Sequence, residues 1–415
     1  MNIQLRLTVM NFMQFFVWGA WLISFGAYMS KSLGFTGVEI GSIYGTMGVA
    51  SLFMPGLLGI VADRWVNAER LYGILHLLGA GLLLWASTVR DYKTLYVIML
   101  LNAMVYMPTI ALNNTISYRV LEQQGLNFIL KFPPIRVWGT IGFVFAMWFT
   151  DLSGGVLTTG QLFISATAAA FLGLYGLTMP ACPPYRDTSR KSVVEALGLD
   201  AFVLFRSPQM VVFFLCAMML GGALQITNAF GGDFLTDFNA TYPDSFGVRH
   251  PILLSSISQI SETFFILTIP FFLKRFGIKI VMMIAIFAWM FRFGLFAYGD
   301  PGPGLWMLVL SMIVYGMAFD FFNISGSMYV NLEANPRIRA SAQGLFMIMT
   351  NGLGAFFGTM LAGAAVDHYT VGGVRDWHSI WLSFAGYALA LGIVFPFVFR
   401  YRHDPAKMIA AAAAH

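Results

Sequence analysis

The chain has 415 residues, of which 58% are hydrophobic and only 10% are charged, and its net charge is +5. A soluble domain carries roughly 25% charged residues, so this composition requires an apolar solvent and excludes an ordinary water-soluble protein. The basic residues are spread over many short loops without a contiguous patch, which argues against a nucleic-acid partner. We therefore expect an integral membrane protein surrounded by lipid.

Apolar runs of roughly 20 residues, the length that crosses the core of a bilayer, follow one another along the chain. The charged residues fall between these runs, because isolated ionisable groups are costly in hydrocarbon. The twelve runs lie at 8–29, 38–62, 71–89, 94–118, 135–151, 159–179, 208–235, 251–273, 279–298, 304–330, 341–366 and 378–399. Each predicts one transmembrane helix. The first run lacks a small-residue cleavage signature, so we expect it to be retained as a helix.

The lysines and arginines are distributed unevenly between the two sides of these spans. Seventeen of the 24 lie on the side of the two termini, five lie on the opposite side, and Arg136 and Arg292 lie within spans. Positive charge resists translocation, so the richer side is predicted to be cytoplasmic. We expect a multi-pass protein of the bacterial inner membrane with both termini in the cytoplasm.

The longest polar stretch separates the sixth span from the seventh and divides the chain into two sets of six spans. We expect an N-terminal half at residues 1–179, a cytoplasmic linker at 180–207, a C-terminal half at 208–400 and a tail at 401–415. The alanine run in that tail is typical of a disordered end.

A short motif follows the second span and recurs in the second half. Gly59, Asp63 and Arg64 belong to the sequence GIVADR, and residues 274–279, KRFGIK, stand at the equivalent place without the aspartate. The motif resembles the loop signature of the major facilitator superfamily. The resemblance implies an all-α integral membrane protein with the major facilitator fold, with twelve transmembrane helices in two six-helix halves and a site between them. It also implies a gating role for this loop; an ordinary charged turn capping two helices is the alternative.

Four spans carry polar or aromatic side chains near their middle, mostly three or four residues apart. A polar group that lipid cannot satisfy must face the protein interior or a water-filled path. The candidates are Arg136, Thr140 and Phe143 in the fifth span, Gln225 and Asn228 in the seventh, Gln259 and Glu262 in the eighth, and Tyr315 and Phe319, with Asp320 beside them, in the tenth. We expect these side chains to line one chamber halfway across the membrane.

The chemistry of these side chains suits a ribose joined to a base. Amides and a carboxylate bond with vicinal hydroxyls and with the edge of a heterocycle, while aromatic rings offer flat apolar area to a planar base. Purely structural roles are the alternative for the same residue types. Glutamine and asparagine also join helices to one another, rings also serve packing, and Glu262 or Asp320 also suits a structural ion pair with Arg136 or Arg292.

Glu262 and Asp320 are the candidates for coupling transport to protons. A low-dielectric cavity disfavours the charged form of a carboxylate, which makes proton exchange near neutral pH feasible. Coupling to sodium is the alternative. The sequence has no cluster of metal ligands and no nucleophile with a base, so we expect neither a metal nor an enzymatic activity, and no cofactor other than the proton.

A closer resemblance covers the whole chain. The segments that carry it are FPPIRVWGTIGF at 132–143, LQITN at 224–228, SQISE at 258–262, YGMAFDFFNISG at 315–326 and ASAQG at 340–344. They resemble the nucleoside:proton symporter family. The resemblance implies uptake of a nucleoside with a proton, and it implicates Asp320 in coupling. It also implies that the nucleoside is bound by Arg136, Thr140, Phe143, Gln225, Asn228, Gln259, Glu262, Tyr315 and Phe319.

The resemblance leaves the choice between purine and pyrimidine nucleosides open. A major facilitator transporter of another polar solute, such as a sugar, is the alternative, because it would share the fold, the arginine and the glutamate. We expect the protein to act as a monomer.

Overall fold

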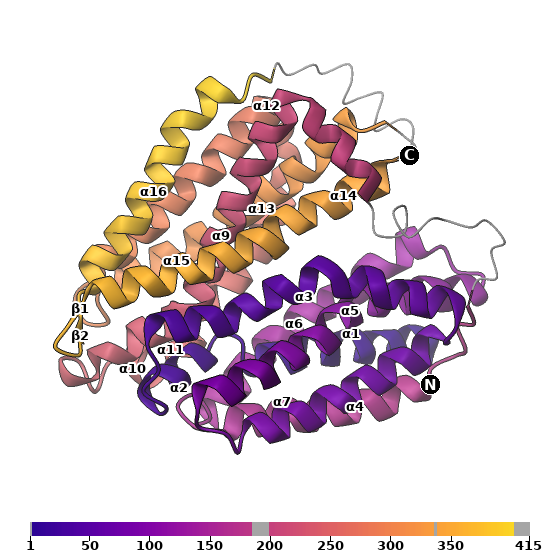
Figure 1. The fold of residues 1–415 in the computed structure, drawn as a ribbon, viewed down its shortest axis with the longest axis horizontal. Helices are drawn as coiled ribbons and strands as arrows, with labels where there is room; N and C mark the ends of the chain where they lie inside the picture. Colours follow the sequence, from indigo (N-terminus) through magenta and orange to yellow (C-terminus); the bar gives the residue numbers. More distant parts are fainter. Residues whose placement is uncertain (1, 185–198, 336–337, 402–415) are drawn as a thin grey trace.

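A computed structural model describes residues 2–184, 199–335 and 338–401 of the chain. Figure 1 shows two groups of helices, α1 to α7 and α9 to α16. The helices of the first group are α1 (Ile3–Gly19), α2 (Phe25–Lys31), α3 (Gly37–Arg64), α4 (Ala68–Ala86), α5 (Tyr92–Gln123), α6 (Phe128–Leu152) and α7 (Gly160–Leu177). Those of the second are α9 (Pro208–Asp237), α10 (Phe246–Arg249), α11 (Pro251–Ser255), α12 (Ile257–Tyr298), α13 (Leu305–Glu333), α14 (Arg339–Met347), α15 (Ala355–His368) and α16 (Trp377–Val398).

Among the described residues, eight helical segments are long and apolar enough to cross a membrane. One of them, Pro251–Tyr298, contains two predicted spans. Its backbone leaves the helical conformation at Gly277, where φ is 75°. Arg292 donates a hydrogen bond to the Ser258 hydroxyl at 3.4 Å, although a continuous helix would separate these residues by about 50 Å. The chain therefore doubles back at Gly277, and the eighth and ninth spans lie side by side.

Three further predicted spans correspond to helices outside these eight. The first span is interrupted between α1 and α2, so α1 has only 17 residues. The helix α4 begins with Glu69 and Arg70, and α6 contains two prolines and Arg136, which lowers the hydropathy of both helices. With these helices, the described residues account for all twelve predicted spans.

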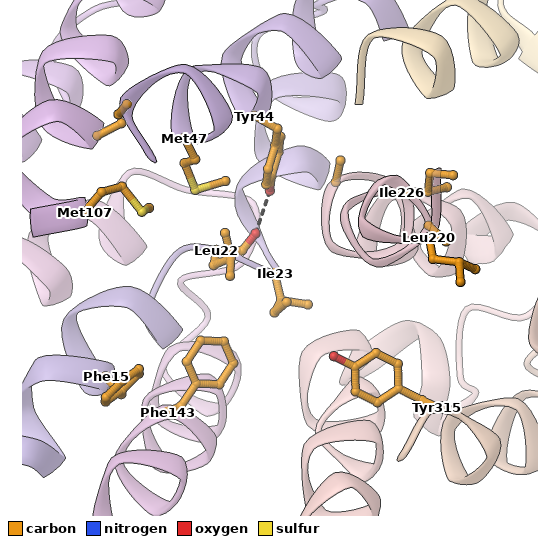
Figure 2. Close-up of a cluster of buried hydrophobic side chains, with 14 of the residues drawn as sticks. Phe15, Leu22, Ile23, Tyr44, Met47, Met107, Phe143, Leu220, Ile226 and Tyr315 are labelled. Carbon is orange, nitrogen blue, oxygen red and sulfur yellow. Dashed lines mark hydrogen bonds between the residues drawn. The ribbon is translucent and has the colours of Figure 1, made fainter. Parts of the chain in front are cut away.

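The break in the first span is stabilised by a tyrosine from α3. The Tyr44 hydroxyl donates to the carbonyl oxygen of Leu22 at 2.6 Å (Figure 2). It also accepts from the backbone N–H of Gly26 at 3.0 Å. Both backbone groups are left free where the helix stops, and buried backbone groups require partners. The sequence predicts one continuous run at this place, so the interruption corrects that prediction.

Two short elements lie between the long helices. Residues Leu199–Arg206, within the predicted linker, form a 3₁₀ helix, η1. Its Phe205 ring lies 5.4 Å from that of Phe214, so apolar packing holds this end of the linker against α9. The strands β1 (Thr370–Val371) and β2 (Val374–Arg375) form a small hairpin before the twelfth span. The remainder of the linker, 185–198, and the tail from 402 lie outside the described residues.

The two groups of helices meet at one end of the molecule. Figure 1 shows them converging where α2, α10, α11 and the hairpin lie, and diverging towards the end where α1 begins and α16 ends. Glycines allow the closest approach there. A Cβ atom added at Gly41 of α3 would lie 2.2 Å from the carbonyl oxygen of Thr359 in α15, so these helices pack backbone against backbone.

Hydrogen bonds and ion pairs between described residues of the two groups gather at this same end. Trp148 of α6 donates to the Ser256 hydroxyl at 2.8 Å. Arg375 of β2 donates to the Ser30 hydroxyl of α2 at 2.7 Å, and Lys31 of α2 pairs with Asp237 of α9. We call this end, with its contacts between the halves, the closed end. The structure is thus sealed on the side away from the start of α1 and the end of α16.

Candidate substrate-binding site

A cavity lies between the two halves, with about 360 Å³ of empty space that includes open solvent. Ile23 and Met147 line it from the N-terminal half. The C-terminal half contributes Thr227, Asn228, Gly231, Ser255, Ser258, Gln259, Arg292, Phe296, Met312 and Tyr315. Three of the predicted site residues, Asn228, Gln259 and Tyr315, therefore share one hollow at the interface.

The wall in the N-terminal half is built by α1 and α6. These helices are in close contact, because a Cβ atom added at Gly19 would lie 2.5 Å from the carbonyl oxygen of Phe143. The Arg136 guanidinium stacks on the ring of Phe15 at 4.1 Å, a cation–π contact. Phe143 meets the Trp18 ring edge-on, with 6.2 Å between their centroids.

Thr140 lies between Arg136 and Phe143 on the helix α6. It is half-buried, one turn from Arg136, and its residue spacing places it on the same stripe of the helix. The predicted stripe of cation, hydroxyl and ring therefore exists on one helix that borders the interface.

The wall in the C-terminal half is built by α9, α12 and α13. The side-chain amide of Asn228 donates to that of Gln225 at 3.1 Å, and both residues are buried. Tyr315 and Phe319 stack nearly parallel, with 6.1 Å between ring centroids and 9° between planes. Gln259 lies beside the Tyr315 hydroxyl. Amides and aromatic rings thus both lie on this wall.

Figure 2 shows the aromatic side chains of the two walls facing one another. Phe15 and Phe143 lie on one side of the interface, and the Tyr315 hydroxyl points towards them from the other. Side chains from spans one, five and ten therefore approach the same space.

Three charged side chains, Arg136, Glu262 and Asp320, interact with one another across the interface. Glu262 of α12 interacts electrostatically with Arg136 of the other half and also with Asp320 of α13. Among the described residues, no salt bridge within 4.0 Å joins either carboxylate to Arg136 or Arg292. Asp320 is only 4% exposed, and no described residue forms a hydrogen bond with its Oδ2 atom. The carboxylates are therefore not members of tight structural ion pairs.

The loop motif lies away from this cavity. Asp63 is near the end of α3, where it accepts a hydrogen bond from Arg119 at 3.3 Å, and its side chain is 63% exposed. Gly59 has open space around it, since an added Cβ atom would meet nothing within 4 Å. The motif therefore takes no part in lining the site.

Sequence reasoning misses most of the residues that line the cavity, Arg292 among them, and also the aromatic residues Phe15 and Trp18 that contact Arg136 and Phe143. Phe15 and Trp18 do not stand out because aromatic residues are abundant in every span, and spacing alone does not distinguish those that face the cavity. Arg292 stands out as a charge inside a span, but its sequence does not place it in the site. One signal for Arg292 is available in the sequence. Its own span has no carboxylate at helical spacing that could neutralise its charge.

The fold and the cavity between its halves define a membrane transporter of the major facilitator type. A model of the family described as "Nucleoside H+ symporter" matches residues 1–404. The xanthosine permease of Escherichia coli K12 is 54% identical over 418 residues, covering 100% of both chains. The nucleoside permease NupG of the same organism is 51% identical over 406 residues, covering 97% of each.

A crystal structure of the nucleoside transporter NupG matches the fold with a TM-score of 0.92 at 51% identity, covering 97% of this chain and 100% of that one. The chain belongs to the nucleoside H+ symporter family. The predicted fold class and family are confirmed, and so is the prediction that the protein is a transporter and not an enzyme.

Proposed function

We propose that the protein carries nucleosides together with protons into the cell across the bacterial inner membrane, with both termini in the cytoplasm. The observation that carries the proposal is the cavity between the halves, where the amides of Asn228 and Gln259, the Tyr315 ring and the Arg292 guanidinium converge. Family membership supports the same substrate class and the same coupling ion. We further propose that a single copy of the chain contains the whole transport path.

Nucleoside recognition is assigned to the predicted residues of both walls. The Gln225–Asn228 pair and Gln259 offer donors and acceptors to the edge of a base, while Tyr315 and Phe319 offer flat apolar area. Glu262 suits the vicinal hydroxyls of ribose, because an ionised carboxylate accepts two hydrogen bonds at once. Arg136, Thr140 and Phe143 complete the site from the other half.

Proton coupling is assigned to Glu262 and Asp320. Two carboxylates that lie close enough to interact disfavour carrying two negative charges together, so one proton is readily held between them. When Glu262 is ionised, it attracts Arg136 across the interface; when it is protonated, this attraction is lost. Proton binding at this pair therefore changes the force that holds the halves together beside the substrate.

The closed end corresponds, in this proposal, to the extracellular side, and the structure represents the state that faces the cytoplasm. The contacts through Trp148, Arg375 and Lys31 seal the route to the outside. Alternating access then requires these contacts to break while the opposite ends of the halves approach. The exposed Asp63–Arg119 pair stands at that opposite end, where the loop motif is proposed to act in closing it.

The test is uptake by proteoliposomes with an imposed pH gradient and labelled uridine. An acidic exterior is expected to drive accumulation of uridine, and excess unlabelled nucleosides are expected to compete, whereas free bases and sugars are not. Competition by sugars alone would favour a transporter of another polar solute. Accumulation driven by a sodium gradient in the absence of a pH gradient would exclude proton coupling.

A further inference from the structure

Arg292 is a buried arginine whose charge has no carboxylate partner in the part of the chain that the structure describes. It lies in the second part of α12 and is only 4% exposed. Among the described residues, no aspartate or glutamate oxygen lies within 4.0 Å of its guanidinium. An unpaired charge removed from water is strongly destabilising, so its retention at this position needs a physical reason.

The protein stabilises this charge only in part. The guanidinium lies 4.7 Å from the ring centroid of Tyr315 and 5.1 Å from that of Phe296. Its Nη1 atom donates to the carbonyl oxygen of Ser311 at 2.9 Å and to the Ser258 hydroxyl at 3.4 Å. The buried Nε atom has no hydrogen-bond partner among residues 2–184, 199–335 and 338–401. Rings, one carbonyl and one hydroxyl orient the group but leave its positive charge without a counterion.

The same arginine lines the cavity between the halves. It borders that space together with Asn228, Gln259 and Tyr315. A cation that faces a binding cavity and has hydrogen-bonding capacity left over is suited to an electron-rich oxygen of a ligand.

Glu262 lies one helical turn from the part of the cavity that Arg292 borders. Ser258, which lines the cavity and contacts Arg292, precedes Glu262 by four residues on α12, which is one turn or about 6 Å along the helix. Tyr315, which also lines the cavity, interacts electrostatically with both Glu262 and Arg292. Ribose hydroxyls suit Glu262, because they donate hydrogen bonds. The base of the same nucleoside then extends towards Arg292.

We propose that Arg292 binds an oxo group of the nucleoside base and so favours bases that carry carbonyl oxygens over bases that carry amino groups. The inference rests on the proposed function, namely that this cavity binds nucleosides. An amino group at the same position would place a donor against a donor. The preference is strongest for a dioxopurine, whose acidic ring loses a proton readily and then carries negative charge. Arg292 is thus assigned a role in specificity for the known class of substrate.

The test compares adenosine, inosine and xanthosine, which are purine nucleosides with no, one and two oxo groups on the base. Binding to the purified transporter is measured by calorimetry for the wild type and for Arg292→Gln. The matched control is Arg275→Gln, because Arg275 is an exposed arginine in the turn between the eighth and ninth spans. We expect Arg292→Gln to weaken xanthosine binding about ten-fold or more, inosine less and adenosine by no more than about two-fold, since hydrogen bonds to a charged group are the strong ones.

Equal losses of affinity for all three nucleosides would overturn the inference. Arg292 would then have only a structural role, linking α12 to α13. The wild type supplies a test that needs no variant, since its affinity must rise from adenosine to inosine to xanthosine; the reverse order would also overturn the inference. Failure of the wild type to bind any of the three would instead refute the proposed function, so the two failures are distinguishable.

Discussion

Asp151 and Asp367 occupy equivalent positions in the two halves, and each caps a helix of the other half. Asp151 is the penultimate residue of α6, and its carboxylate accepts a hydrogen bond from the backbone N–H of Ile252 in α11 at 2.8 Å. Asp367 is the penultimate residue of α15, and its carboxylate accepts one from the N–H of Gly37 in α3 at 2.5 Å. The fifth span thus caps the eighth, and the eleventh caps the second.

This reciprocal capping has a clear physical effect on the closed end. The first N–H groups of a helix lack partners within the helix, and the positive end of its dipole attracts an anion. Each aspartate satisfies such groups across the interface, and Asp151 also contacts the His250 ring at 2.8 Å. Both caps must break when the closed end opens, so they stabilise the observed state relative to the opposite one.

Removing either cap is expected to shift the equilibrium towards the state that is open at this end. Loss of a cap costs about 1 kcal/mol, which corresponds to roughly a five-fold change in population. Asp151→Ala or Asp367→Ala, combined with Ile23→Cys in the cavity, should increase labelling by an impermeant maleimide added outside. The native cysteines, Cys182 and Cys216, are buried and contribute little background.

The control for this experiment is Asp91→Ala. Asp91 caps α5 within its own half by accepting from the N–H of Thr94 at 2.9 Å, and that bond does not join the two halves. Labelling that rises equally in the control would show that helix capping in general, and not the link between the halves, causes the effect.

Close packing of α3 on α15 predicts that a side chain at Gly41 blocks closure. A Cβ atom there would lie 2.2 Å from the carbonyl oxygen of Thr359, so the helices would have to separate. Gly41→Val is expected to reduce uridine uptake at least about ten-fold at equal expression, because overpacking costs about 1–3 kcal/mol. Gly81→Val is the matched control, since Gly81 has nothing within 4 Å of an added Cβ. Normal uptake by the Gly41 variant would refute the role of this contact.

Replacement of the two carboxylates assigned to proton coupling is expected to separate nucleoside binding from nucleoside accumulation against a gradient. Glu262→Gln and Asp320→Asn keep the shape of each side chain but remove the proton that it exchanges. Each variant should abolish accumulation against a gradient in vesicles while the protein remains in the membrane. If both variants still accumulate nucleoside at normal rates, the assignment of the proton site is wrong.

Each uncharged contact to the nucleoside is expected to contribute a modest amount to the free energy of binding. Gln225→Ala, Asn228→Ala and Phe143→Ala should each weaken uridine binding by about 1 to 2 kcal/mol, the value of a hydrogen bond or an aromatic contact. Phe171→Ala provides a control, because the Phe171 side chain is 50% exposed on the outside of α7. Calorimetry that finds unchanged affinity in all three site variants would move the binding site elsewhere.

Hydropathy predicts most of the fold because lipid demands uninterrupted apolar helices. It fails where the local sequence stays apolar although the backbone bends. Residues 20–24 interrupt the first span only because Tyr44, distant in sequence, satisfies the free backbone groups. No local pattern carries that information.

The candidate site is predictable to the extent that its polar residues stand out in apolar helices. Gln225, Asn228 and Gln259 are found in this way. Aromatic residues give a weaker signal, since Phe322 belongs to the same stripe as Tyr315 but packs on the Phe213 ring at 6.3 Å. Arg292 requires the tertiary structure, because only the fold shows that it lines the cavity and that no carboxylate of another described helix pairs with it.

Joint entry of nucleoside and proton is best examined by recording both in one experiment. Proteoliposomes without a pH gradient are supplied with uridine, and the external pH is followed while uridine enters. We predict that the medium becomes more alkaline in step with uridine entry, and that Glu262→Gln abolishes this change. Uridine entry by the wild type without any proton movement would contradict symport.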